Sequence, residues 1–135
     1  MSSDQNIDTI KAVYAAFGRG DVDAILGAVA DDVDWGSDTS ATGAPWFGIR
    51  NGKQAVAAFF EDLGKAVEVE DFTPLTFGSN DDGDVFAVVR YAARVRETGK
   101  VAKMQIHHWF HFTAGKISYY RGTEDTAITL DAFKR

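Results

Sequence analysis

Several features are absent from this 135-residue chain or scarce in it. It has no cysteine, which excludes disulfides, thiolate metal ligands and a cysteine nucleophile. It has only two prolines and no compositionally biased stretch, so no segment is predicted to be disordered. Basic residues are outnumbered 20 to 14 by acidic ones, and the formal net charge of -6 disfavours binding to a nucleic acid or to an anionic membrane surface.

Long hydrophobic runs are missing as well. No apolar run approaches the ~18 residues of a membrane span, and residues 1–14 lack the basic start and apolar core of a signal peptide. We therefore expect a cytoplasmic protein. The length is that of one ordinary domain, and residues 1–135 are expected to form it.

Helical periodicity dominates the first half of the chain. Apolar residues recur at helical spacing over residues 7–17, and again over residues 22–29, where Asp21 is a candidate N-cap. A strand is predicted at residues 33–37. A glycine-rich loop then leads to a third helix, whose apolar face includes residues 56–63.

The second half changes to an alternating pattern. Strands are predicted at residues 68–78, 85–96, 101–112 and 117–124, because turn-like sequences separate these runs. Asp125 is the expected N-cap of a last helix. Helices followed by consecutive hairpins indicate an α+β domain, in which helices cover one face of a curved antiparallel sheet.

All three histidines lie in the segment MQIHHWFHF, residues 104–112. On a strand, His107 and His111 share a face but lie about 13 Å apart, while His108 points to the opposite face. Ligand bonds near 2.0 to 2.1 Å cannot join side chains placed in this way to one metal ion. We therefore predict no metal site and no cofactor.

The even-numbered residues of this strand are apolar except for His108, so they are predicted to face the core. A buried imidazole needs a hydrogen-bond partner or a cavity. A two-residue Thr98-Gly99 loop would place Val89 opposite His108 and Tyr91 opposite Ile106, and a three-residue loop at residues 113–115 would place Tyr120 opposite His108.

This register brings Tyr91, His108 and Tyr120 together on the concave face, beside the open space at Gly122. His108 then either satisfies a packed core or contacts a ligand, and both interpretations stay open. Glu124 is likewise either an inward residue near Met104 or a strand-end residue that reaches water.

The outward face of the predicted sheet is unusually apolar. A self-complementary face buried in a two-fold dimer would explain this composition. The residues concerned are Phe86, Val88, His107, Trp109, His111, Ile117 and Tyr119.

Three stretches together carry a resemblance to a known family: AAFGRGDVDAILGAVADDVDW, PWFGIRNGKQAVAAFFEDL and HHWFHFTAGKISYYRGTEDTAI. They resemble the SnoaL-like, ketosteroid-isomerase-related branch of the nuclear-transport-factor-two-like superfamily, over nearly the whole chain. The resemblance implies a cone-shaped, strongly curved mixed or antiparallel sheet wrapped around three N-terminal helices, with a deep pocket between them. It also implies a homodimer.

The catalytic groups of characterised relatives are not matched. Val13 stands where ketosteroid isomerases carry a tyrosine, and Ser37 stands where they carry the aspartate base. Val89, Tyr91 and Gly122 stand where limonene epoxide hydrolases carry one arginine and two aspartates.

Trp35, Trp46, Phe60 and Tyr120 match positions that commonly line the pocket of this superfamily. The complete predicted lining of the ligand pocket is Val13, Phe17, Trp35, Ser37, Trp46, Phe60, Val89, Met104, Ile106, Phe110, Gly122 and Glu124.

Three functions are compatible with these residues. The first is an enzyme for a mostly apolar cyclic small molecule, in which His108 transfers a proton and Tyr120 and Tyr91 orient it or donate to an oxygen; isomerisation, cyclisation and hydrolysis would all fit. The second is a ligand-binding or carrier protein without catalysis. The third is a structural dimer module with a filled core.

Overall fold

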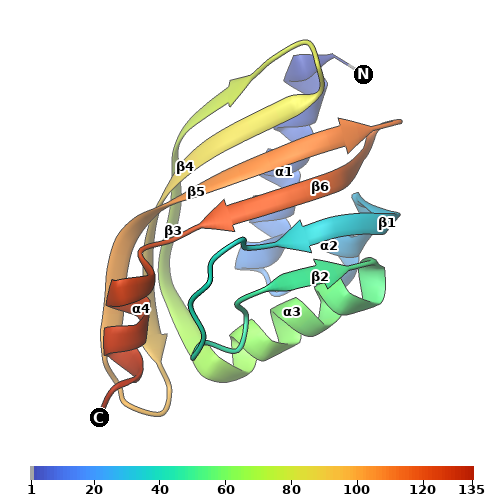
Figure 1. Cartoon of the computed structure of the whole chain (residues 1–135). Coiled ribbons are helices and arrows are strands. Elements are labelled where there is room, and N and C mark those ends of the chain that lie inside the picture. The colour runs from blue at the N-terminus through green and yellow to red at the C-terminus, as the bar shows by residue number, and fades with distance from the viewer. Residues whose placement is uncertain (1) are drawn as a thin grey trace.

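Residues 2–135 are described by the computed structural model, and within them four helices accompany one six-stranded sheet (Figure 1). The elements follow in the order α1 (Ser3–Gly18), α2 (Val22–Gly27), β1 (Val29–Gly36), β2 (Ile49–Asn51), α3 (Lys53–Ala66), β3 (Val67–Ser79), β4 (Asp84–Val95), β5 (Val101–Thr113), β6 (Lys116–Thr123) and α4 (Thr126–Phe133). The predicted α+β class is confirmed. None of these helices is both long and apolar enough to cross a membrane.

Side-chain caps explain where the helices begin. Ser2 and Gln5 form a capping box at the start of α1. The carboxylates of Asp21 and Asp125 accept hydrogen bonds from first-turn amides of α2 and α4, as the sequence predicts. α2 is shorter than expected, because Val29 already belongs to β1.

The sheet is mixed, with the strand order β2-β1-β6-β5-β4-β3. β1 and β6 run parallel, and the other neighbouring strands are antiparallel. The sheet curves strongly without closing, and α1 and α3 lie along its inner side (Figure 1). The cone implied by the resemblance is confirmed. The inner face therefore becomes the wall of an enclosed space.

One strand was not predicted. Residues 49–51 form β2 at the edge of the sheet, inside the stretch that the sequence indicated as loop. Two of its three residues are exposed, so it carries no apolar alternation by which it could be recognised.

The predicted register between β4 and β5 was wrong by two residues. His108 pairs with Ala87, Val89 pairs with Ile106 and Tyr91 pairs with Met104. The connection is longer than two residues, since the amide of Val95 bonds the carbonyl of Lys100. A shift of two keeps every side chain on its predicted face.

The predicted register between β5 and β6 was also wrong. Ala114 and Gly115 both have positive φ, at 50° and 79°, and form a two-residue turn that pairs Thr113 with Lys116. A bulge between His111 and Phe112 then places Gly122, rather than Tyr120, opposite His108.

Because of the bulge, the outward face of the sheet has one apolar residue fewer than predicted. Ile117 pairs with Phe112 and is fully buried, so it does not belong to the exposed apolar surface.

Candidate functional site

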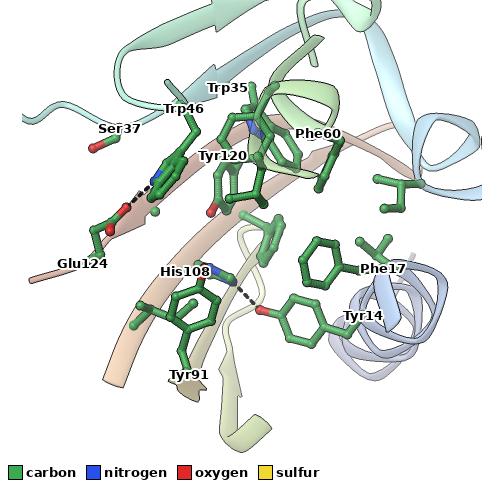
Figure 2. Close-up of a pocket in the computed structure, with 18 of the residues that line it drawn as sticks. Tyr14, Phe17, Trp35, Ser37, Trp46, Phe60, Tyr91, His108, Tyr120 and Glu124 are labelled. Carbon is green, nitrogen blue, oxygen red and sulfur yellow. Dashed lines mark hydrogen bonds between the residues drawn. The ribbon is translucent and has the colours of Figure 1, made fainter. Parts of the chain in front are cut away.

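A cavity of about 110 Å³ lies between the inner face of the sheet and helices α1, α2 and α3 (Figure 2). Its walls are mostly aromatic and aliphatic. An engineered apolar cavity of about 150 Å³ holds a benzene molecule, whereas pockets for drug-sized ligands span about 300–1,000 Å³. The space therefore suits one small ring.

Most of the predicted pocket residues line this cavity. They are Val13, Phe17, Trp35, Ser37, Trp46, Phe60, Tyr91, Ile106, His108, Phe110, Tyr120, Gly122 and Glu124. Val89 and Met104 do not line it. Val89 was placed beside His108 by the mistaken β4–β5 register, and it is fully buried opposite Ile106. Met104 was placed by the alternation of its strand and beside Glu124 by the mistaken β5–β6 register, and it lies opposite Tyr91.

His108 is bonded to a residue that the sequence analysis did not place in the pocket. Its Nδ1 lies 2.7 Å from the hydroxyl oxygen of Tyr14, on α1 (Figure 2). The direction of this hydrogen bond depends on the imidazole tautomer: in one tautomer Tyr14 donates and Nδ1 accepts. The proton of the imidazole is then on Nε2, and Nε2 has no hydrogen-bond partner within residues 2–135.

Burial keeps this histidine neutral. It lowers the pKa of His108 to about 3, and the charge of neighbouring His107 acts in the same direction. Burial also raises the pKa of Tyr14, with a smaller contribution from Tyr120. The ring of His108 keeps part of its surface accessible although it lies deep in the fold. In the tautomer in which Tyr14 donates, the pair places an uncharged imidazole with an unbonded Nε2–H at the wall of the cavity.

Two further hydroxyls border the same space. Burial raises the pKa of Tyr91 and Tyr120, and the carboxylate of Glu124 adds to both shifts. Tyr120 stacks at 4.0 Å on Trp35, with which it pairs across β1 and β6. The indole Nε1 of Trp35 is buried without a partner in the described chain.

Gly122 makes room for Tyr120. A methyl group at this position would overlap the hydroxyl of Tyr120 and would lie 3.5 Å from Cδ2 of His108. Glycine is therefore needed here for space, and it brings the two rings together.

Glu124 closes one side of the cavity. Its Oε1 accepts a 2.7 Å hydrogen bond from Nε1 of Trp46 (Figure 2), and its Oε2 accepts one from the hydroxyl of Thr129. The inward placement of Glu124, one of the two alternatives left open by the sequence, is the one adopted.

Several lining residues were missed. These are Tyr14, Ile25, Gly36, Phe59, Leu63, Phe72 and Thr123. Tyr14 could have been found, because it follows Ile10 by four residues and precedes Phe17 by three, on one face of α1. The family resemblance instead predicted Val13, next to Tyr14, as the pocket residue that matches the isomerase tyrosine.

Within residues 2–135, no group of three or more His, Asp or Glu side chains is placed to hold a metal ion. The described site consists of aromatic walls, one neutral imidazole and one carboxylate.

Comparison with known proteins identifies the family. Residues 10–120 match the SnoaL-like domain. The chain belongs to the SnoaL-like domain family. The resemblance noted in the sequence is thereby confirmed. No curated protein matches the sequence.

Solved structures share the fold of this SnoaL-like domain over its full length. An NTF2-like protein from Burkholderia xenovorans LB400 is 25% identical, with 99% of each chain covered and a TM-score of 0.87. An NTF2-like protein of unknown function from Burkholderia pseudomallei K96243 is 23% identical, with 100% of each chain covered and a TM-score of 0.89. TerC, co-crystallized with polyporic acid, is 20% identical, covers 97% of this chain and 99% of its own, and has a TM-score of 0.86.

Proposed function

We propose that this SnoaL-like domain binds a small, mostly apolar ring compound in the cavity and holds one oxygen of that compound with Nε2–H of His108. The observation that carries the proposal is a neutral imidazole that is bonded through Nδ1 alone and that borders an aromatic space of the size of one ring. The co-crystallization of TerC, a protein of the same fold, with polyporic acid supports a ligand site in this fold.

The donor role fits the environment of His108 better than the role of proton acceptor. A pKa of about 3 makes the imidazole a weak base near neutral pH. A fixed N–H donor in an apolar site instead stabilises negative charge on a ligand oxygen. This favours a second candidate function, in which isomerisation, cyclisation or hydrolysis proceeds through such a polarised oxygen, oriented by Tyr91 and Tyr120.

A matched pair of probes tests the binding proposal. Cyclohexanone and methylenecyclohexane differ only in the carbonyl oxygen, and their binding can be measured by ligand-observed NMR. His108→Phe keeps a ring but removes the donor, so we expect cyclohexanone to bind about tenfold more weakly, or ~1.4 kcal/mol. Binding of the hydrocarbon should be unchanged.

The control variant is His107→Phe, which removes an imidazole from the other face of β5 and should bind like the wild type. If neither compound binds the wild-type protein, or if His108→Phe binds both as the wild type does, the proposal is wrong. Turnover of compounds found by a broader screen distinguishes an enzyme from a carrier protein. Compounds that bind but are not turned over by the wild type or by His108→Phe support a carrier.

We further propose that a second copy of the chain covers the outer face of the sheet. Phe86 and Trp109 are 44% and 41% exposed and stack on each other, and Tyr119 packs edge-on against Trp109 at 4.9 Å. A two-fold dimer buries such a patch against itself. Val88, His107 and His111 lie on the same face.

The cytoplasmic location stays a prediction from the sequence.

Sedimentation measures this assembly. The wild type should have the mass of a dimer, and Trp109→Lys should have the mass of a monomer. A monomeric wild type would refute the dimer.

A further inference from the structure

We infer that Glu124 selects the ligand by charge: the cavity accepts neutral or cationic ring compounds that carry a hydrogen-bond donor and rejects carboxylates. This inference rests on the proposed ligand-binding function and names the chemical class of the ligand.

The carboxylate of Glu124 is held in place at the cavity wall. Trp46 binds one oxygen and Thr129 binds the other, and both of these residues are buried, Thr129 to all but 3% of its surface. These two hydrogen bonds favour the observed orientation of the carboxylate, in which Glu124 lines the cavity and keeps part of its surface exposed. It therefore remains part of the surface that a ligand meets.

The carboxylate still has capacity for a ligand. Each carboxylate oxygen can accept two hydrogen bonds, and each oxygen of Glu124 accepts one within the described chain. A hydroxyl or ammonium group on the ligand can supply another. Figure 2 shows Glu124 on one side of the aromatic space and the Tyr14–His108 pair on the other, so a ligand can meet an acceptor and a donor at separate points.

No positive charge in the cavity compensates for this carboxylate. The residues that line it include no lysine and no arginine, and His108 is neutral. The negative charge acts across the space, since it contributes to the raised pKa of Tyr91 and of Tyr120. Charges interact strongly in such a poorly solvated site, so an anionic ligand is repelled and a cationic one is attracted.

Four probes with the same ring and different charge test the inference: toluene, benzyl alcohol, protonated benzylamine and benzoate. Their dissociation constants are measured at pH 7 by ligand-observed NMR. In the wild type, benzoate should bind at least tenfold more weakly than benzyl alcohol. This ratio needs no variant, so it stands even if a substitution at the site impairs folding.

Glu124→Gln removes the charge and retains both hydrogen bonds, because its amide can accept from Trp46 and donate to Thr129. The preference for benzylamine over benzoate should fall at least tenfold in this variant, with toluene unchanged. Asp131→Asn is the matched control: it changes the net charge equally at an exposed position of α4 and should behave as the wild type does.

The outcomes separate the two proposals. If the wild type binds toluene and benzyl alcohol but binds benzoate equally well, the charge selection is refuted and the binding function stands. The same holds if Glu124→Gln leaves the benzylamine preference intact. If none of the four compounds binds, the ligand-binding function fails, and the inference fails with it.

Discussion

Acid should destabilise this protein through His108 in a way that can be calculated. An unfolded chain exposes the imidazole, whose pKa is then about 6.5. In the folded protein, burial among the cavity walls lowers the pKa to about 3. Between these two values the unfolded state binds a proton that the folded state does not. The contribution of His108 to the unfolding free energy is therefore fully present above about pH 6.5 and is lost as the pH falls toward 3.

The magnitude follows from the two pKa values. Each pKa unit corresponds to 1.36 kcal/mol, so acidification from pH 7 to pH 4 should remove about 3 kcal/mol of unfolding free energy through this one group. That is a large share of the ~5–15 kcal/mol by which ordinary domains are stable.

Urea unfolding at pH 7, 5.5 and 4 measures the effect. Carboxylates also titrate in this range, so the wild type is compared with His108→Gln, which cannot be protonated. The wild type should lose about 3 kcal/mol more than the variant between pH 7 and pH 4. His107→Gln, changed on the outer face of the same strand, should follow the wild type.

Two results would refute this reasoning. One is an identical pH dependence of unfolding in the wild type and in His108→Gln. The other is an NMR titration in which the His108 ring is protonated near pH 6.5 in the folded protein, as a solvent-exposed imidazole would be.

Three further changes test individual contacts. Gly122→Ala should lower the unfolding free energy by about 1–3 kcal/mol, since the new methyl group overlaps the hydroxyl of Tyr120, and adding Tyr120→Phe should recover part of the loss in a double-mutant cycle; additive losses would count against the overlap. Tyr14→Phe should cost about 1–3 kcal/mol in urea unfolding by leaving Nδ1 of His108 without its donor, and an unchanged midpoint would show that the bond contributes nothing. Asp125→Ala should cost about 1 kcal/mol through the lost cap of α4, whereas Asp125→Asn should cost much less; equal losses would argue against capping.

The inward and outward faces of β4 and β5 could be predicted from the sequence, but the registers of the hairpins, and with them the face of Ile117 in β6, could not. Alternation in β4 and β5 assigned His108 to the inside, because the period of a strand is two residues. The alternating pattern stays the same when the register shifts by two residues. The prediction of the residues opposite His108 therefore depended on the assumed loop lengths. Ala114 adopts a positive φ, which is uncommon for alanine. The sequence therefore favoured a three-residue turn with glycine in the left-handed position over the two-residue turn that forms.

The chemistry of the site was predicted only in part. The inward imidazole and the aromatic walls follow from periodicity and from the family resemblance. The partner of His108 does not, because Tyr14 lies 94 residues away in the sequence and reaches it only through the packing of α1. Likewise, the bonds that fix Glu124 join it to Trp46, in a loop without regular structure, and to Thr129 of α4.

The parallel pairing of β1 with β6 has a consequence for how the chain acquires this structure. Trp35 pairs with Tyr120 only after almost the entire polypeptide has been made, so during synthesis β1 can pair with β2 on one edge while its other edge has no partner. Closing such a long loop costs conformational entropy before the contact between the strands forms, so this pairing is expected to be a slow step of folding. During this interval the edge of β1 that later pairs with β6 is open to association with another chain.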